Sequence, residues 1–387
     1  MTSDASDGGP PPLRSFLFYF LRLGTLGFGG PIALAGHMQQ DLVEQRGWIT
    51  PQEYKEGLAL AQLAPGPLAA QLAMYLGWVR ARRLGATLVA VAFIGPSFLM
   101  VLILSDLYVR FGGLAWIQGL FYGIGAAVIA IIARSVLKLV RMTLGRDRVL
   151  WVLFTVSALV TAWAETEIIW VFVLCGVVPM LLRRRRTGLA TAAVAFLPAA
   201  PGLAGLGGPA SAGVLWKILV YFAGAALFVF GSGLAIVPFL YGGVVRQFHW
   251  LTERQFIDAV AVSMITPGPV VITVAFIGYL VAGLAGATLA AVGVFVPVYL
   301  VVVFVAPHFH RVAKNWRVKA FVDGVTAAAT GAIAGAAVIL GRRSLPDLPT
   351  ILIALATLTL LLVPRKIPEP ALIMAAGLVG LVLRGTT

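Results

Sequence analysis

Two copies of a Pro-Gly-Pro motif are the residues whose types and spacing most directly suggest chemistry. The first is Pro65, Gly66 and Pro67, and the second, 202 residues later, is Pro267, Gly268 and Pro269. Each interrupts an apolar stretch, and because proline has no amide hydrogen and glycine does not stiffen the backbone, each ends a helix. The half-helix that follows begins with unpaired amides, which together with the helix dipole attract an anion. We interpret the two motifs as parts of one anion site.

A proline kink that only shapes helix packing is the competing interpretation of either motif taken alone. Breaks at matching places in two halves of a chain are typical of the substrate site of a secondary transporter, so the pairing favours a site. Lipid does not tolerate unpaired backbone groups. Each break must therefore be buried in protein or line an aqueous cavity.

Polar side chains near the breaks would complete such a site. Gln71 and Thr273 each lie four residues after the last proline of a motif, and Thr266 lies in the second break. All three can hydrogen-bond an oxyanion, although a threonine hydroxyl can instead bond its own helix backbone. Arg22 lies about eight residues into the first apolar stretch. We expect it either to balance the charge of the anion or to extend to the cytoplasmic surface.

A glycine-rich stretch in the first apolar segment is a further candidate. It holds Gly29, Gly30 and Pro31, and a weaker echo in the second half holds Gly231 and Gly233. Glycines there would let the helix unwind beside a ligand, or would let helices pack closely. The sequence leaves both interpretations open. The lysine of a phosphate-binding loop does not follow these glycines, so that loop is excluded.

Charged residues beside the apolar segments have two interpretations each. Glu56 and Asp258 occupy equivalent positions ahead of the two breaks, where a carboxylate could carry a coupling proton or, as the sequence favours, cap a helix N-terminus. Arg134, Lys138 and Arg141 share one helix face. They suggest an anion vestibule or, as favoured, a cytoplasmic topology anchor.

The elements that must position these residues are helices in a membrane. The 387 residues are 60% hydrophobic and only 11% charged, with mean hydropathy +0.96, whereas a soluble domain has about a quarter charged residues. The basic residues behind the net charge of +14 lie in short loops between apolar runs, so they reflect membrane topology rather than nucleic-acid binding. The single cysteine excludes a cysteine metal site. We expect no metal, no cofactor and no enzymatic activity.

The sequence predicts an all-α fold of thirteen apolar segments in two halves. We expect a disordered tail over 1–12, a first transporter repeat over 13–186, a linking and membrane-spanning segment within 187–213, and a second repeat over 214–387. The segments lie at about 14–36, 54–79, 84–108, 114–141, 149–164, 166–182, 188–206, 215–241, 256–281, 284–306, 320–341, 348–363 and 368–384.

The two halves are predicted to be inverted repeats. Trp48 returns as Trp250 after 202 residues, and Arg110 returns as Arg311 after 201. With the N-terminus in the cytoplasm, 19 basic residues lie inside and 7 outside, which the positive-inside rule favours. Equivalent loops differ in charge: Arg80 to Arg83 is basic and inside, whereas its counterpart around 282–285 is uncharged and outside. Six segments plus one linking helix then place the second half upside down. This is the architecture of secondary transporters.

The order of these motifs resembles the chromate ion transporter family. The resemblance covers about residues 15–340 and is to the long members, which carry both halves in one chain. In this sequence the motifs run from Phe20 to Pro31, from Arg46 to Ile49, from Gln62 to Leu72, from Phe230 to Gly233 and from Pro267 to Pro269. One departure is Leu68-Ala69-Ala70 after the first break, where the family is often polar. It shifts the expected contacts toward backbone amides.

The resemblance implies a multi-pass protein of the bacterial inner membrane that exports chromate, confers chromate resistance and can recognise sulfate. It also marks Arg22, the glycine turn, both Pro-Gly-Pro motifs and Gln71 as positions to test. Uptake of sulfate or another anion on the same scaffold is the alternative, and a passive channel or an intramembrane enzyme are further ones. The expected partners are the anion and membrane lipid, with a homodimer left open and no nucleic acid.

Overall fold

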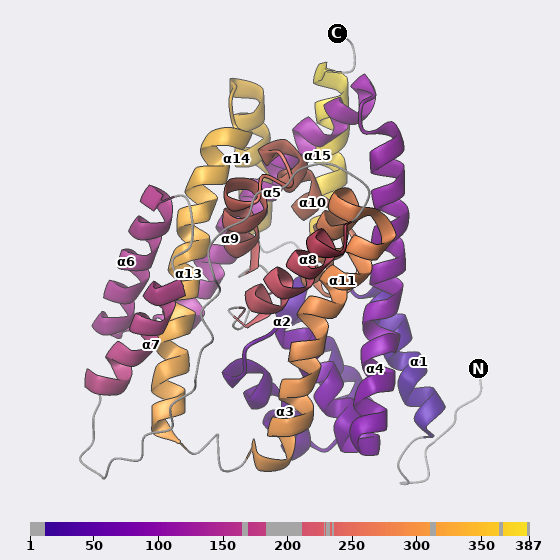
Figure 1. Ribbon diagram of the computed structural model, residues 1–387, viewed down its shortest axis with the longest axis vertical. Coiled ribbons are helices and arrows are strands. Elements are labelled where there is room, and N and C mark those ends of the chain that lie inside the picture. The colour runs from indigo at the N-terminus through magenta and orange to yellow at the C-terminus, as the bar shows by residue number, and fades with distance from the viewer. Residues whose placement is uncertain are drawn as a thin grey trace.

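The computed structural model describes residues 12–164, 169–182, 211–227, 229, 233, 236–309, 315–363 and 367–384. Throughout these residues the regular structure is helical, as predicted (Figure 1). The expected linking segment 188–206 and most of the glycine echo, Phe230 to Ser232, lie outside the described residues. The α-helices are α1 (Leu13–Leu26), α2 (Gly30–Met38), α3 (Pro51–Leu63), α4 (Leu68–Phe111), α5 (Ala115–Thr143), α6 (Arg148–Ala164), α7 (Ile169–Leu182), α8 (Ala212–Ala226), α9 (Ile236–Leu240), α10 (Glu253–Ile265), α11 (Thr273–Val305), α13 (Trp316–Ser344), α14 (Leu348–Leu362) and α15 (Glu369–Arg384).

Four long helical stretches are apolar enough to cross a membrane: α4, α5, α13 and the stretch 270–308 that contains α11. Shorter apolar helices, among them α6, α7, α8 and α14, accompany them. Large hydrophobic side chains such as Val91, Leu99 and Ile103 on α4 are more than half exposed. Such a surface suits lipid rather than water. The chain is therefore a multi-pass membrane protein.

Four of the thirteen predicted segments prove to be helical hairpins, which corrects the prediction that each crosses the membrane as one segment. They are the segments 14–36, 54–79, 215–241 and 256–281. Their first helices, α1, α3, α8 and α10, have 13 to 15 residues, which corresponds to about 20 Å. The hydrocarbon core is about 30 Å thick. Each helix ends at a loop, here called a tip, where the chain turns back.

Contacts between the two arms show the hairpins of the first half. In hairpin 1 (13–48), the Phe16 ring near its start lies 6.3 Å from the Trp48 ring at its end, and the Arg46 guanidinium lies over Tyr19. In hairpin 2 (51–80), the Tyr75 hydroxyl donates a hydrogen bond of 3.3 Å to Glu56. The turns between these arms are tip 1 (27–30) and tip 2 (64–67).

The second half repeats this arrangement. In hairpin 3 (212–250), the Tyr221 hydroxyl donates to the Phe239 carbonyl at 2.6 Å. In hairpin 4 (253–281), the Tyr108 side chain contacts both arms, with its hydroxyl on Asp258 and its ring 5.3 Å from that of Phe276. Tip 3 lies between α8 and α9, where Leu227, Val229 and Gly233 are described, and tip 4 is 266–269.

A second sharp turn follows hairpins 2 and 4 and divides both α4 and α11 into two arms. The backbone leaves helical geometry at Ala81 and Arg82 in α4, and at Ala282 and Gly283, 201 residues later, in α11. The long second arms then run antiparallel. Thr87 is hydrogen-bonded to Tyr299 at 2.9 Å, whereas Asp106, farther along α4, accepts from Tyr279 ahead of the α11 turn.

The two halves exchange their last helices. Helix α5 packs against α14 and α15, and α13 packs against α6 and α7, as Figure 1 shows. Small residues permit this close approach. Gly123 on α5 lies against the Ala376 carbonyl of α15, and the equivalent Gly324 on α13 lies against the Cys175 carbonyl of α7. Gly331 on α13 packs in the same way, against the Phe154 backbone of α6.

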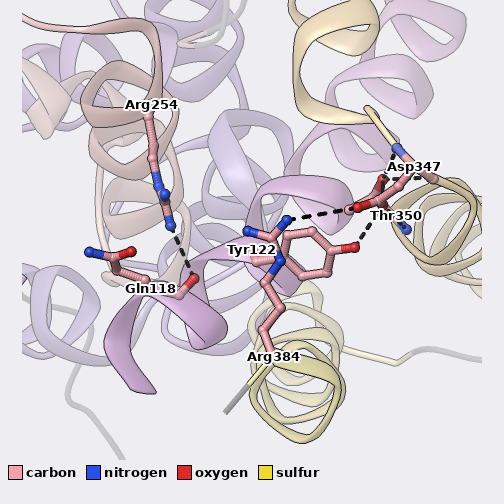
Figure 2. A network of polar contacts seen from close by, with 6 residues as sticks. All are labelled: Gln118, Tyr122, Arg254, Asp347, Thr350 and Arg384. Atoms are coloured by element: carbon pink, nitrogen blue, oxygen red, sulfur yellow. Dashed lines mark hydrogen bonds and ion pairs between the residues drawn. The ribbon is translucent and has the colours of Figure 1, made fainter. Parts of the chain in front are cut away.

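A polar network fastens one end of this arrangement (Figure 2). Asp347 caps α14 by accepting from the Thr350 amide and hydroxyl, and it accepts a hydrogen bond of 2.6 Å from Tyr122 on α5. Arg384 at the end of α15 stacks on the Tyr122 ring and lies 4.0 Å from Asp347. Three helices from both halves therefore meet at this end.

Candidate functional site

The tips of the first half are hydrogen-bonded to the tips of the second. The Gly66 amide in tip 2 donates to the Val229 carbonyl in tip 3 at 2.6 Å. The Gly268 amide in tip 4 donates to the Gly27 carbonyl in tip 1 at 2.9 Å. The two bonds are equivalent, because Gly66 and Gly268 are 202 residues apart and so are Gly27 and Val229. The four tips thus form a unit of two hydrogen-bonded pairs, each of which joins one tip of the first half to one tip of the second.

Glycine is required in this unit for both conformation and space. Gly66 and Gly268 have φ of 136° and 101°, a region that side chains rarely adopt. A Cβ at Gly268 would collide with the hydroxyl oxygen of Ser97 on α4. The buried Ser97 donates to the Pro267 carbonyl at 2.8 Å and lies 3.2 Å from the Gly24 carbonyl. Ser97 therefore positions tip 4, a role for which the sequence offers only a serine beside Pro96 in an apolar helix.

Tip 2 is closed by protein. Gln71 is fully buried, and its amide nitrogen donates to the Pro65 carbonyl at 2.6 Å. Its side-chain oxygen has no hydrogen-bond partner among the described residues. The predicted site residues Pro65, Gly66, Pro67 and Gln71 thus lie together, and they are not among the residues that line the cavity described below.

The two threonines bond their own helices, which is the alternative that the sequence left open. The Thr266 hydroxyl donates to the Val262 carbonyl at 2.7 Å, and the Thr273 hydroxyl donates to the Val270 carbonyl at 2.8 Å. A hydroxyl has one hydrogen, so neither can donate to an anion while these bonds persist. Thr266 lines the cavity described next, whereas the fully buried Thr273 does not.

A cavity of about 490 Å³ lies between tip 1, tip 4, the last third of α5 and the start of α15. Tip 1 and α2 supply Gly29, Gly30, Pro31 and His37, tip 4 supplies Thr266 and Gly268, α5 supplies Arg134, Ser135 and Lys138, and the chain around the start of α15 supplies Ile367 to Pro370. Val270 at the first turn after tip 4 also contributes. The Val270 amide begins this turn and has no intrahelical acceptor, so this wall offers one backbone donor.

Positive charge dominates the cavity. Arg134 and Lys138 lie one helical turn apart on α5, and the Arg134 guanidinium is 3.0 Å from the Glu369 carboxylate at the start of α15. Arg134 and Lys138 line the cavity, as the vestibule interpretation of the α5 cluster requires, whereas Arg141 does not line it. Glu369 and His37 are lining residues that the sequence analysis missed, because they come from segments far apart in the chain.

The cationic lining has no counterpart in the other half. A shift of 201 residues converts Arg134 to Gly335 and Lys138 to Ile339. Both equivalent residues are buried by helix packing and do not line the cavity: Gly335 lies against the Ala158 backbone, and Ile339 is buried. The duplicated scaffold therefore carries paired cationic side chains at one of two equivalent places.

The remaining predicted residues lie elsewhere. Arg22 is exposed on α1 and does not line the cavity. Asp258 is buried and accepts a hydrogen bond of 2.7 Å from Tyr108, whereas the half-buried Glu56 bonds Tyr75 and Gln52. Neither carboxylate caps its helix, which corrects the favoured interpretation. Thr50 with Glu53 caps α3 instead, and Thr252 with Gln255 caps α10.

Comparison with known proteins identifies the same two halves. The family model described as chromate transporter matches residues 14–180 and again residues 216–381. No solved structure matches the chain.

Curated relatives are similar over nearly their whole length. A chromate transport protein from Cupriavidus metallidurans is 58% identical, over 96% of this chain and 93% of the relative. A probable chromate transport protein from Synechococcus elongatus is 50% identical, over 96% and 95%. A chromate transport protein from Pseudomonas aeruginosa is 32% identical, over 98% and 95%.

Proposed function

Because this chain belongs to the chromate transporter family, we propose that it is a secondary transporter that carries chromate out of the bacterial cytoplasm and so confers chromate resistance. The protein is a chromate transporter and not an enzyme. The observation that carries the proposal is the cavity lined by Arg134, Lys138 and, at the first turn after tip 4, Val270. Fixed positive charge and unpaired amides are the groups that bind a tetrahedral dianion.

The substrate path follows an inverted repeat. The proposed inversion is supported by the antiparallel second arms of α4 and α11 and by the tip-to-tip hydrogen bonds between the halves. Hairpins 1 and 2 enter the membrane from the cytoplasm, hairpins 3 and 4 enter from outside, and their tips meet near the middle. Rocking of the halves would then expose the tips to each side in turn.

The direction of transport is inferred from the one-sided charge. With the N-terminus in the cytoplasm, α5 ends at the cytoplasmic cluster of Arg141, Arg146 and Arg148, so the cavity opens to that side. Chromate is captured there by Arg134 and Lys138, and the equivalent outer place offers Gly335 and Ile339 instead. An inside-negative potential favours expulsion of a dianion by about 4.6 kcal/mol per 100 mV.

The test is chromate accumulation in bacteria that express the protein, compared with cells carrying an empty vector. Export predicts lower accumulation and higher chromate tolerance. Radiolabelled sulfate is measured in parallel, because it shares the shape and charge of chromate and is our second candidate substrate. Raised accumulation of either anion would instead support uptake on the same scaffold.

A coupling proton is carried by Asp258 in our proposal, since it is buried with Tyr108 as its hydrogen-bond donor, while Glu56 is half-buried. Asp258→Asn keeps the shape and the Tyr108 contact but cannot release a proton. We expect it to abolish proton-driven chromate flux in proteoliposomes while chromate–chromate exchange continues. Glu56→Gln is the matched comparison. Proton-driven flux that survives in Asp258→Asn and is lost in Glu56→Gln would move the role to Glu56.

A further inference from the structure

An ion pair occupies the cationic wall of the cavity. The Arg134 Nη1 atom lies 3.0 Å from Glu369 Oε1, and the two side chains are 38% and 29% exposed. Both residues line the cavity. Arg134 belongs to α5 of the first half and Glu369 begins α15 of the second, so the pair also joins the two halves.

We propose that Glu369 is a resident carboxylate that occupies Arg134 when the cavity is empty and that the transported oxyanion must displace. The inference rests on the proposed function of the cavity as the anion site. A carboxylate and a tetrahedral oxyanion present the same kind of charged oxygen, and a guanidinium binds either through its N–H groups. Lys138, one turn along α5 and on the same cavity wall, adds attraction for a dianion.

Displacement has a thermodynamic consequence. The anion binds Arg134 only by replacing an existing charged partner, so Glu369 lowers the apparent affinity. An exposed ion pair contributes at most about 1 kcal/mol, which limits the effect to a modest factor. Weak binding of this kind favours release of the anion after the halves rock.

The position of the pair gives it a second consequence. Along α5 and α15, Gly123 packs against Ala376 and Gly380 without an intervening side chain, and Arg384 stacks on Tyr122. That end of the helix pair is held by packing, whereas Arg134 and Glu369 tie the end that borders the cavity. An anion that takes Arg134 releases this tie. Binding then favours movement of the start of α15 relative to α5.

A salt bridge that merely stabilises the fold is the competing account, and charge-neutral variants distinguish the two. Equilibrium binding of radiolabelled chromate is measured on the purified full-length protein, with melting temperature as a second readout. We expect Glu369→Gln to lower the Kd about two- to fivefold and Arg134→Gln to raise it. In the Arg134→Gln background, Glu369→Gln should have no further effect on Kd, because the group for which both anions compete is gone.

Two further variants keep the test decisive. Glu369→Asp retains the charge but shortens the side chain, so Kd should fall between wild type and Glu369→Gln even if the latter folds poorly. Glu253→Gln removes a different ion pair, with Arg343, outside the cavity, and should leave Kd unchanged. An unchanged or raised Kd in Glu369→Gln, with wild type binding chromate, would overturn the proposal. Wild-type protein that neither binds nor moves chromate would instead overturn the proposed function.

Discussion

At the scale of residues, the cavity combines mobile charge with fixed backbone. Arg134 and Lys138 supply long cationic side chains, while Val270, directly after tip 4, supplies a backbone amide at a place fixed by Gly268 and Ser97. Charge attracts an anion over a Debye length of about 8 Å at physiological salt, and the backbone provides directed hydrogen bonds. The two contributions can be removed separately.

Loss of a cationic side chain should weaken binding. We expect Lys138→Gln to raise the KM for chromate by severalfold with little change in kcat, because the attraction is lost before and after the halves move. Initial rates of flux into proteoliposomes measure this. Lys55→Gln removes an exposed lysine outside the cavity and serves as the control. Arg22→Gln removes the positive charge that the sequence suggested for the site. A larger increase of KM in Arg22→Gln than in Lys138→Gln would show that Arg22 is the residue that attracts the anion.

A methyl group at tip 4 should disrupt the backbone contribution. Gly268→Ala adds a Cβ at a positive φ and into Ser97, so tip 4 must move. We expect at least a tenfold loss of transport and a destabilisation of about 1–3 kcal/mol. Gly95→Ala, where a Cβ meets nothing within 4 Å, is the control. Equal activity of the two variants would show that the position of tip 4 does not matter for transport.

At the scale of elements, hairpins place the breaks where helices alone could not. Helices of about 20 Å reach the middle of a membrane and stop. Thr50 and Thr252 cap the first helix of the second hairpin in each half, at the end away from the tip. The Gly66 and Gly268 amides are paired across the halves, and both glycines are buried, so the unwound backbone of tips 2 and 4 does not face lipid. Each hairpin therefore both interrupts the helix and buries the interrupted backbone inside the protein.

The Asp347 cap should give one end of the bundle a pH-dependent stability. Burial acts to raise the pKa of Asp347, but hydrogen bonds from Tyr122 and Thr350 and the charge of Arg384 hold that pKa below its ordinary value. A depressed pKa contributes stability above the unfolded-state pKa of about 4 and loses it as the pH falls further. The melting temperature of wild type should exceed that of Asp347→Asn at pH 7, and the difference should shrink below about pH 4. A difference that grows in acid would contradict the assignment.

At the scale of the whole molecule, one scaffold is used twice with unequal lining. The hairpins, the turns at Arg82 and Gly283 and the exchanged helices recur in both halves. The cationic pair on α5 does not recur. Equal scaffolds allow two conformations of similar energy, and unequal charges make the two sides bind the anion differently. That combination would give the anion different apparent affinities on the two sides of the membrane.

Cysteine labelling tests the hairpins. In a Cys175→Ala background, cysteine replaces Gln52, Arg83, Gly113 or Arg254, and intact cells receive a membrane-impermeant maleimide. The hairpins predict labelling of Gly113→Cys and Arg254→Cys and protection of Gln52→Cys and Arg83→Cys. Spanning segments would reverse the result at positions 52 and 254 alone, so positions 83 and 113 are internal controls. Reversal at positions 52 and 254 would restore the thirteen-span topology.

The sequence by itself determined the helical membrane class, the family, the duplication and the location of the breaks, because these follow from local composition and from proline and glycine chemistry. It could not distinguish a spanning segment from a hairpin. Exchanging the two topologies moves Arg46 and Lys55 to the inside and Arg246 and Arg254 to the outside, which leaves the balance of 19 to 7 unchanged.

Only the tertiary structure decided which residues meet. Tip 4 is hydrogen-bonded to tip 1, and Arg134 pairs with Glu369, 235 residues away in the sequence. Arg22 does not line the cavity. These contacts depend on how the two halves pack together, since α5 of the first half packs against α14 and α15 of the second. The spacing along one chain carries no record of that exchange. Local physics fixes the break in each helix, and packing between the halves fixes what faces it.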